Sequence, residues 1–430
     1  MYDWANSAMV TIIVTAVFPI FYRSVTAVGL EADVADYRFT MATTLALVLS
    51  AVLSPVLGTV ADYTASKLRF LAGFLVLGLL AVALMFFLRE GMWAAALGLF
   101  MLANIGANGS FVFYDALLPH VAAPAQMDRL STAGYALGYL GGGLLLALCL
   151  GLIMAPGAFG LPSGEGLSAA AASLPARLSF LLTALWWGVF AIPLFRRVPE
   201  PPSVPWSGAG RGAAVLASLK QLGATLGHLR RYRQAFLLLV AFLIYNDGIG
   251  TIIRMATLYG EGIGISRTWM IGSIVAVQFI GIPFSFLFGA IGDRIGAKRA
   301  IFIGLMVYAG ISVLGYYMTT PLHFVLLACL VGTVQGGTQA LSRSLFASMI
   351  PRRKSGEFFG FFSVFEKFAG ILGPLFFGIM IAATGSARNA ILSVMLFFIV
   401  GGGLLWFVNV DEGQAAAREA DAAEPAPRQP

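Results

Sequence analysis

Long apolar runs alternate with short polar stretches along the whole chain. Each run is long enough, at a helical rise of ~1.5 Å per residue, to cross the ~30 Å of hydrocarbon in a bilayer. The runs cover residues 4–23, 39–61, 69–88, 92–118, 130–155, 177–195, 234–258, 268–292, 299–318, 322–350, 357–383 and 387–409. The pattern predicts twelve transmembrane helices and therefore an all-α integral membrane protein.

The polar stretches carry most of the charge, and its sign gives an orientation. Of the 430 residues, 59% are hydrophobic and 11% are charged, which is too little charge to cover the surface of a soluble protein. The net charge of +7 is concentrated in the loops on one side of the predicted helices, as expected of cytoplasmic loops. An even number of helices puts both termini on that side. The basic balance therefore indicates contact with membrane lipid and gives no support for nucleic-acid binding.

A polar hairpin occurs in two loops, about half a chain length apart, which indicates an internal duplication. Each copy leaves one apolar run at a glycine and enters the next through an aspartate and basic residues. The residues concerned are Gly58, Asp62, Lys67 and Arg69 in the first copy and Gly289, Asp293, Arg294, Lys298 and Arg299 in the second. The duplication predicts two halves of six helices each.

The chain thus divides into four predicted parts. The halves are residues 1–195 and 234–410, and a cytoplasmic linker, 196–233, joins them. Four prolines near its start stop the preceding helix, and leucines at helical spacing further on predict a short amphipathic helix on the inner leaflet. The tail, 411–430, is rich in Ala, Glu and Pro, and we predict that it is disordered.

Ionisable side chains inside the predicted helices are few, and each needs a partner or a function because burial in a membrane is costly. Helix seven carries Asn246 and Asp247, with Arg254 about two turns later. Asp247 either faces a transport pathway or forms a structural pair with another helix. Helix eleven carries Glu366 and Lys367, which point about 100° apart, so we do not expect them to neutralise each other. Glu366 is either a proton carrier or a member of an interhelical pair.

Polar residues form stripes at i, i+4 spacing on three other helices. On helix one the stripe runs from Asp3, beside Asn6, through Ser7 to Thr11 and Thr15; it either lines a wet cavity or consists of a helix cap and hydroxyls bonded to their own backbone. The others are Asn104 and Asn108 on helix four, and Gln335, Gln339 and Arg343 on helix ten. The helix-ten line could recognise a carboxylate or hydroxyl, or could bridge helices.

Glycines recur on helices five and eleven and predict close packing and a kink. They are Gly134, Gly138 and Gly142, and Gly370, Gly373 before Pro374, and Gly378. Other signatures are missing from the sequence. It has no phosphate-binding Gly-x-x-x-x-Gly-Lys-Ser/Thr stretch, and its three histidines are too scattered to form a metal cluster. We therefore expect no cofactor, no metal and no enzymatic activity.

Two motifs resemble known families. The hairpins resemble the loop signature Gly-x-x-x-Asp-Arg-x-Gly-x-Arg-Arg of the major facilitator superfamily; the second copy fits it, whereas the first lacks the arginine after the aspartate and the inner glycine. The start of helix one, Tyr2-Asp3-Trp4-Ala5-Asn6-Ser7-Ala8, resembles the vacuole-effluxer branch of that superfamily, which comprises a fungal autophagy-related vacuolar amino-acid exporter and bacterial permeases of unknown substrate.

The resemblance implies a major facilitator fold and a secondary transporter in a bacterial inner membrane, which we expect to be monomeric. It implies alternating access, outward movement of a neutral amino acid or similar solute, and proton coupling through Glu366 or Asp247. It also implies a cytoplasmic gate in which Asp115 shares the loop cations with Asp62, while Asp293, Arg294, Lys298 and Arg299 serve the other half. A same-fold sugar or drug transporter, and a lipid translocase, remain alternatives.

Overall fold

The computed structural model describes residues 1–164, 166–204, 232–262, 264–370 and 372–423, and over these ranges the regular structure is helical. Within these ranges, twelve helical segments are long and apolar enough to cross a membrane. They span Tyr2–Thr26, Ala32–Thr64, Lys67–Phe87, Trp93–Val121, Pro124–Met154, Ala169–Arg197, Arg233–Ala256, Gly272–Ile295, Ala297–Tyr316, Pro321–Ser348, Arg352–Thr384 and Ala387–Trp406. The predicted number of helices and the all-α fold class are confirmed. The amphipathic helix predicted between 215 and 229 lies outside the described residues.

Some of these spans consist of several shorter helical segments, because the backbone changes between α-, 3₁₀- and π-helical pitch along them. The helices of the first part of the chain are α1 (Tyr2–Met9), η1 (Val10–Ala16), α2 (Val17–Phe21), η2 (Tyr22–Thr26), α3 (Ala32–Thr64), α4 (Lys67–Leu84), η3 (Met85–Phe87), α5 (Trp93–Ala116), α6 (Leu118–Val121), η4 (Pro124–Gln126), α7 (Met127–Met154), η5 (Pro156–Phe159), α8 (Ala169–Ala172) and α9 (Leu174–Arg197).

The second part of the chain continues in the same way. Its helices are α11 (Arg233–Gly262), α12 (Arg267–Ile295), α13 (Ala297–Tyr316), α14 (Pro321–Ser348), η6 (Arg352–Lys354), α15 (Ser355–Phe368), α16 (Leu372–Thr384), α17 (Ala387–Ser393), α18 (Met395–Trp406) and α19 (Val410–Ala423).

The chain forms two compact units that do not coincide with its linear halves. Unit 1 contains Met1–Leu53, Leu68–Tyr114 and Leu137–Pro199, and unit 2 contains Ser54–Lys67, Asp115–Ala136 and Glu200–Pro430. The division runs through α3, α5 and α7, so one end of each of these helices belongs to unit 2. The two six-helix halves and the linker boundaries inferred from the sequence stay a prediction.

Unit 1 is organised around α1, which packs tightly against α7 and α9. A side chain on Gly141 of α7 would come within 2.4 Å of the Trp4 carbonyl oxygen, and one on Gly138 within 2.5 Å of Ser7 Oγ. The Trp4 indole stacks on Trp186 of α9 with ring centroids 5.6 Å apart. The close packing predicted for Gly138 and Gly142 is therefore confirmed, because a side chain at either position would meet α1.

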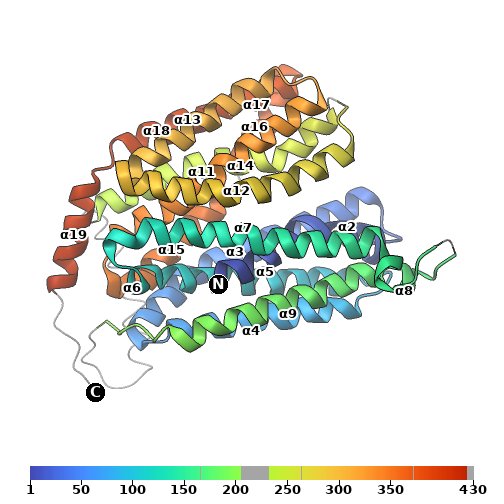
Figure 1. Cartoon of the computed structure of the whole chain (residues 1–430), viewed down its shortest axis with the longest axis horizontal. Coiled ribbons are helices and arrows are strands. Elements are labelled where there is room, and N and C mark those ends of the chain that lie inside the picture. The colour runs from blue at the N-terminus through green and yellow to red at the C-terminus, as the bar shows by residue number, and fades with distance from the viewer. Residues whose placement is uncertain (165, 205–231, 263, 371, 424–430) are drawn as a thin grey trace. The chain divides into compact units, whose positions relative to one another are not determined.

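Unit 2 has its core between α11 and the helices that follow it. Helices α12, α13 and α14 lie side by side, and α11 packs against α18 and α15 (Figure 1). Buried aromatic side chains fill the spaces between them; Phe242 stacks on Phe362 with centroids 4.6 Å apart, and Tyr308 on Phe398 at 5.3 Å. This core positions the ends of α14 and α15, where the candidate site lies.

The C-terminal tail differs from its prediction. Residues 410–423 form helix α19, whereas the sequence predicts disorder from 411 onward. Alanine, glutamate and arginine are strong helix formers, and α19 also finds partners in unit 2. Gln234 of α11 donates to the Glu412 carboxylate at 2.8 Å, and Gln414 donates to Ser348 Oγ at 3.1 Å. These contacts to the body of unit 2 supply the stability that an isolated short helix lacks.

The α1–α7 contact gives a direct test of the packing in unit 1. Gly141→Ala should lower the thermal stability of the purified protein in detergent, because its Cβ must displace a backbone oxygen, at a cost of ~1–3 kcal/mol. Gly98→Ala on α5 is the matched control: nothing lies within 4 Å of its Cβ position, so the higher helix propensity of alanine should leave stability equal or slightly raised. Equal melting temperatures for both variants would contradict this packing.

Candidate functional site

Asp62, at the end of α3, caps the first turn of α15, a helix almost 300 positions later in the chain. Its carboxylate accepts hydrogen bonds from the Gly356 backbone N–H at 3.0 Å and the Glu357 N–H at 2.7 Å. Lys67 Nζ lies 2.6 Å from the same carboxylate, and both side chains are only 1% exposed. The N–H groups of a first helical turn have no acceptor within the helix, so a carboxylate from elsewhere in the chain can accept their hydrogen bonds. Its negative charge is also stabilised by the partial positive charge of the helix N-terminus.

Glycine at three positions lets α3 and α15 approach closely enough for this cap. A Cβ on Gly58 would lie 2.1 Å from the Gly356 carbonyl oxygen, and a Cβ on Gly356 would lie 2.6 Å from the Gly58 oxygen. One turn further along, a Cβ on Gly360 would lie 2.6 Å from Pro55 Cα. The predicted gate residue Gly58 therefore acts through backbone contact.

Arg343 of α14 makes a second buried contact with residues from the first part of the chain. It donates from Nη1 to Asp115 Oδ1 at 2.9 Å, from Nε to Ser131 Oγ at 3.0 Å, and from Nη2 to the Ser131 carbonyl at 3.2 Å. Its guanidinium also lies over the Tyr135 ring, 4.9 Å from the centroid. We call the contacts of Asp62 and Arg343 together the loop-end lock.

Asp115 binds Arg343 of helix ten, and Arg343 thereby bridges α14 to the first part of the chain, which is the second of the two roles open to its line. The physical reason is geometric: a planar guanidinium has donors for a carboxylate and a serine at once, whereas Lys67 is already engaged by Asp62. The sharing of the loop cations between Asp115 and Asp62 stays a prediction. Arg69 of the same loop is exposed.

Two further contacts surround the lock. His120 Nε2 lies 3.1 Å from Oγ of Ser355, the first residue of α15. The backbone N–H of Val204, the last described residue before the gap at 205, donates to the Asp62 carbonyl at 2.8 Å. The start of the predicted linker is thus bonded to the residue that caps α15.

The second hairpin copy does not repeat this arrangement. Asp293, Arg294 and Arg299 are exposed, Lys298 donates to the carbonyls of Trp406 and Val408 at 2.8 and 2.7 Å, and a Cβ on Gly289 would lie 2.2 Å from Thr132 Oγ1. Helix α7, the counterpart of α15, already carries Asp128 in its own first turn, where Ser344 donates to it.

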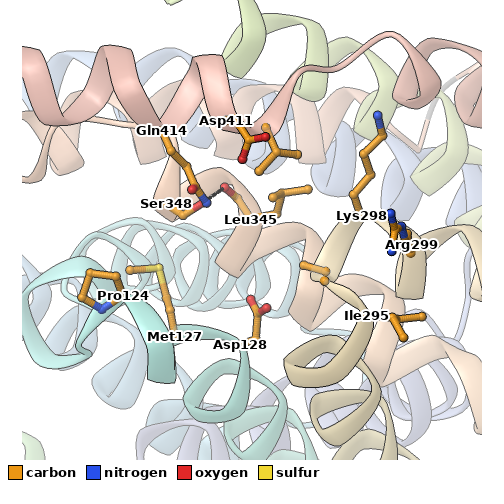
Figure 2. Close-up of a pocket in the computed structure, with 13 residues that line it drawn as sticks. Pro124, Met127, Asp128, Ile295, Lys298, Arg299, Leu345, Ser348, Asp411 and Gln414 are labelled. Carbon is orange, nitrogen blue, oxygen red and sulfur yellow. Dashed lines mark hydrogen bonds between the residues drawn. The ribbon is translucent and has the colours of Figure 1, made fainter.

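A cavity of about 470 Å³ lies beside the lock in unit 2. It is bordered by the starts of α7, α13 and α19 and by the ends of α12 and α14. Figure 2 shows Asp128 and Met127 on one side and Gln414 and Asp411 on the other. Its lining includes Lys298 and Arg299, so two of the predicted gate cations face this cavity rather than a buried acid.

Helix eleven is interrupted, and side chains of α11 bind both ends of the interruption. Helix α15 ends at Phe368 and α16 begins at Leu372. Asp247 Oδ2 accepts from the Gly373 N–H in the first turn of α16 at 2.7 Å, and Arg254 Nη1 donates to the Gly370 carbonyl at 3.1 Å. An acid thus lies at a helix N-terminus and a base near a helix C-terminus, each with the sign that the helix dipole favours.

Glycine makes room for both side chains. A Cβ on Gly370 would lie 2.6 Å from Arg254 Nη1, and one on Gly373 would lie 1.8 Å from Thr251 Oγ1. Pro374 fits in the first turn of α16, where its missing N–H would have had no helical acceptor. The predicted kink therefore takes the form of a break, whereas nothing lies within 4 Å of a Cβ on Gly378.

Glu366 and Lys367, near the end of α15, form an ion pair with each other. Lys367 Nζ lies 2.7 Å from Glu366 Oε2, with side-chain exposures of 12% and 38%. The expectation that adjacent residues cannot neutralise each other is wrong here. Both side chains are long, and close to the helix end they bend toward each other although their Cβ atoms diverge.

The polar stripes mostly satisfy their hydrogen bonds locally. Asn104 and Asn108 of α5 are buried and donate to carbonyls one turn earlier, those of Phe100 and Asn104. Gln339 donates to Asn246 at 3.3 Å and so bridges α14 and α11, the second of the two roles open to that line. Gln335 is half-buried.

On helix one, a change of pitch splits the predicted stripe. Asp3 is not a helix cap, because α1 begins at Tyr2; its carboxylate accepts from the Tyr114 hydroxyl. Thr11 donates to the Ser7 carbonyl at 2.8 Å, and Thr15 to the Val10 carbonyl at 3.2 Å. The segment η1 is a π-helix with more residues per turn, so Thr15 is exposed whereas Asp3, Asn6 and Thr11 are buried.

Sequence reasoning missed Ser131, Asp128, Ser344 and His120. Each is a common polar residue near a helix end, and such residues usually face solvent. Asp128 and Ser131 follow Pro124 at the predicted start of a helix. An acid in the first turn of a helix is the sequence signal that could have identified Asp128 as a candidate.

The membrane spans and the helical architecture give this protein the fold of the major facilitator type. It superposes on the E. coli fucose:proton symporter with a TM-score of 0.69, at 14% identity over 95% of this chain and 98% of that one. The proton:xylose symporter XylE gives 0.70 at 13% identity, covering 97% and 96%. At such identities the likeness shows the fold.

The chain belongs to the family described as "Vacuole effluxer Atg22 like", which it matches over residues 23–418. It is 38% identical over 411 residues to the uncharacterized MFS-type transporter YxiO of Bacillus subtilis, covering 95% of this chain and 93% of YxiO. Autophagy-related protein 22 of Yarrowia lipolytica is 27% identical over 325 residues, or 69% of this chain. That match spans about half, 53%, of the fungal protein.

The buried Asp62–Lys67 pair should behave unequally when its members are removed. Asp62→Asn leaves a buried cation without its partner and should cost ~3 kcal/mol or more, whereas Lys67→Met leaves the carboxylate with two N–H donors and should cost less. The double variant should recover part of the Asp62→Asn loss. Thermal unfolding in detergent measures all three. The exposed Asp293→Asn is the matched control, with an expected change within ~0.5 kcal/mol; equal losses at 62 and 293 would contradict the difference between the hairpins.

Arg343→Lys should lower the stability of the protein, because lysine cannot make the contacts of the arginine. A single ammonium group cannot reach the Asp115 carboxylate and both Ser131 oxygens with the same geometry, so we expect a loss of ~1–3 kcal/mol in unfolding free energy from hydrogen bonds left unmade. Arg294→Lys in the exposed hairpin is the matched control. If the two variants melt together, the lock does not depend on the guanidinium geometry.

Proposed function

We propose that this protein is a secondary active transporter that moves a small solute across a bacterial inner membrane by alternating access. The observation that carries this proposal is the loop-end lock. Its contacts join α3, α5 and α7, from the first part of the sequence, to α14 and α15 from the second, and they bury charges that are stable only while paired. Such a set of contacts exists in one conformation and biases the equilibrium toward it.

The lock accounts for how one end of the pathway closes. Opening it breaks the Asp62 cap of α15 and the Arg343 contacts together, because all of them lie at the same end of unit 2. The basic residues at this end indicate that it faces the cytoplasm, with both termini on that side. The predicted six-helix halves are the bodies that move apart, and a single chain supplies both.

The substrate that we propose is a neutral amino acid or similar metabolite, moved outward. Family membership supports this through the vacuole-effluxer relatives. Proton coupling is supported by two acids of unit 2, Asp247 and Glu366, that lie within membrane spans near the α15–α16 break. Discontinuous helices with exposed ends are common substrate and ion sites in transporters.

A same-fold transporter of sugars is the second candidate, and one observation favours it. Asn246 and Gln339 form an amide pair between α11 and α14, and amide groups of this kind can recognise hydroxyls. The fold neighbours named above are sugar symporters, but at 13–14% identity they carry the fold alone.

The direct test is counterflow in proteoliposomes. Vesicles loaded with an unlabelled neutral amino acid should accumulate the labelled compound transiently, and empty liposomes should not. If verified, folded protein exchanges no amino acid, the substrate assignment fails, and sugars, drugs and then lipids form the next panel.

The lock predicts a separation of transport from binding. Asp62→Asn should slow exchange by about tenfold while the substrate Kd changes by less than about threefold, because the lock acts on the conformational equilibrium and does not touch substrate. Asp293→Asn should leave exchange and binding near wild type, because Asp293 is exposed. Parallel loss of binding and exchange in Asp62→Asn would sink the gating role.

A further inference from the structure

We propose that the coupling proton binds Asp247 at Oδ1, and that its presence or absence sets whether helix α16 is capped. The α15–α16 break is then the element through which proton binding moves helix eleven. This inference rests on the proton-coupled transport proposed above and goes further by choosing one acid, one oxygen atom and one mechanical consequence.

The two oxygens of Asp247 differ in their surroundings. Oδ2 accepts the Gly373 N–H at 2.7 Å, whereas Oδ1 is buried and has no hydrogen-bond partner among the described residues. The residue as a whole is 0% exposed. A buried carboxylate oxygen without a donor is costly, and protonation at that oxygen removes the charge and makes the other oxygen a weaker acceptor for the Gly373 N–H.

The space around Oδ1 favours the smallest ligand. A Cβ on Gly373 would lie 3.0 Å from Oδ1 and 1.8 Å from Thr251 Oγ1, so α11 and the start of α16 are in close contact here. Thr251 already donates its hydroxyl to the Asp247 carbonyl at 2.7 Å. A metal ion needs several oxygen ligands at more than ~2 Å, and this packing offers no such shell.

The charged residues on the neighbouring helices indicate that Asp247 is the acid that gains and loses the proton. Arg254 of the same helix attracts it electrostatically and is held at the Gly370 carbonyl. Helices α16 and α18 bring no titratable side chain. On helix α15, Glu366 and Lys367 pair with each other at 2.7 Å. On α14, Arg343 binds Asp115. On α17, Arg388 binds the Met318 carbonyl. The rival acid, Glu366, thus already has its counter-charge.

The mechanical consequence follows from the cap. As a carboxylate, Asp247 satisfies the first turn of α16 and complements its positive end. When one proton from the aqueous side adds to Oδ1, the neutral acid accepts more weakly and no longer opposes the helix dipole. Helix α16 can then move relative to α15, which Arg254 continues to hold at Gly370. Loss of the proton to the opposite side restores the cap, and no other reactant is needed.

The test uses proteoliposomes with an imposed pH gradient and a substrate established by counterflow. Wild type should accumulate substrate when the gradient is imposed. Asp247→Asn should lose this accumulation by about tenfold or more, yet still show counterflow at a reduced rate, because exchange needs no net proton movement. Glu90→Gln, at an exposed turn, is the matched acid-to-amide control.

Three results would overturn the proposal. If Asp247→Asn still accumulates substrate when the gradient is imposed, Asp247 is not the proton site. If Glu366→Gln loses gradient-driven accumulation instead, Glu366 is the proton site. In both cases proton coupling itself stands. A wild type that exchanges substrate but ignores the gradient removes proton coupling itself, and this inference with it. The outcomes of the two proposals are therefore separable.

A second measurement avoids variants of Asp247 altogether. In a background with Cys149 and Cys329 replaced by alanine, a cysteine introduced by Leu372→Cys reports on the start of α16, and one introduced by Leu375→Cys, a turn later, serves as reference. The ratio of their alkylation rates should change by about threefold or more between pH 8 and pH 5, the size expected for loss of a charge at a helix terminus. A ratio that is constant over this range overturns the uncapping step.

Discussion

The first turn of a helix has N–H groups with no partner of their own, and in an apolar protein they must find one elsewhere. In this transporter the first turn of α15 finds it in Asp62, a residue from the other end of the sequence. The contact fixes much around it: Gly58 and Gly356 must remain small, Lys67 must be buried as the counter-ion, and Val204 binds the carbonyl of the same aspartate. Because the partner comes from a different segment, the helix end is satisfied only in one arrangement of the chain.

The same rule operates a second time inside unit 2. At the α15–α16 break, Asp247 satisfies a helix start and Arg254 satisfies a carbonyl near a helix end. Both sites place a charge of the favourable sign at a terminus that the helix cannot satisfy itself. The first is the loop-end lock, and the second is the cap within a membrane span that we propose to depend on a proton. A transporter needs contacts that exist in one state and not in another, and uncompensated helix ends supply them without any change in the covalent chain.

The lengths of the apolar runs predict the membrane fold well. In lipid, a long apolar segment has no water to bind its backbone N–H and C=O groups, so it forms a helix in which these groups bind one another. The hairpin repeat also leads to Asp62 and Lys67, because an aspartate and basic residues recur at the same place in both copies. Pairing is less predictable. Arg343 shares a helix face with Gln339, yet its long side chain reaches Asp115 and Ser131. Glu366 and Lys367 meet although their Cβ directions diverge, and the acidic α19 folds because Gln234 and Ser348 bind it. These outcomes depend on side-chain reach and tertiary partners, which spacing in sequence does not contain.

Hydrogen–deuterium exchange at the start of α15 tests the account most directly. The amides of Gly356 and Glu357 have no acceptor within their helix, so their protection depends on Asp62 and reports whether the lock is closed. We predict slow exchange of a peptide covering residues 353–360 in protein without substrate, and clearly faster exchange during counterflow, when the loop end opens repeatedly. Exchange that stays equally slow throughout turnover would contradict the claim that the Asp62 cap breaks in the transport cycle.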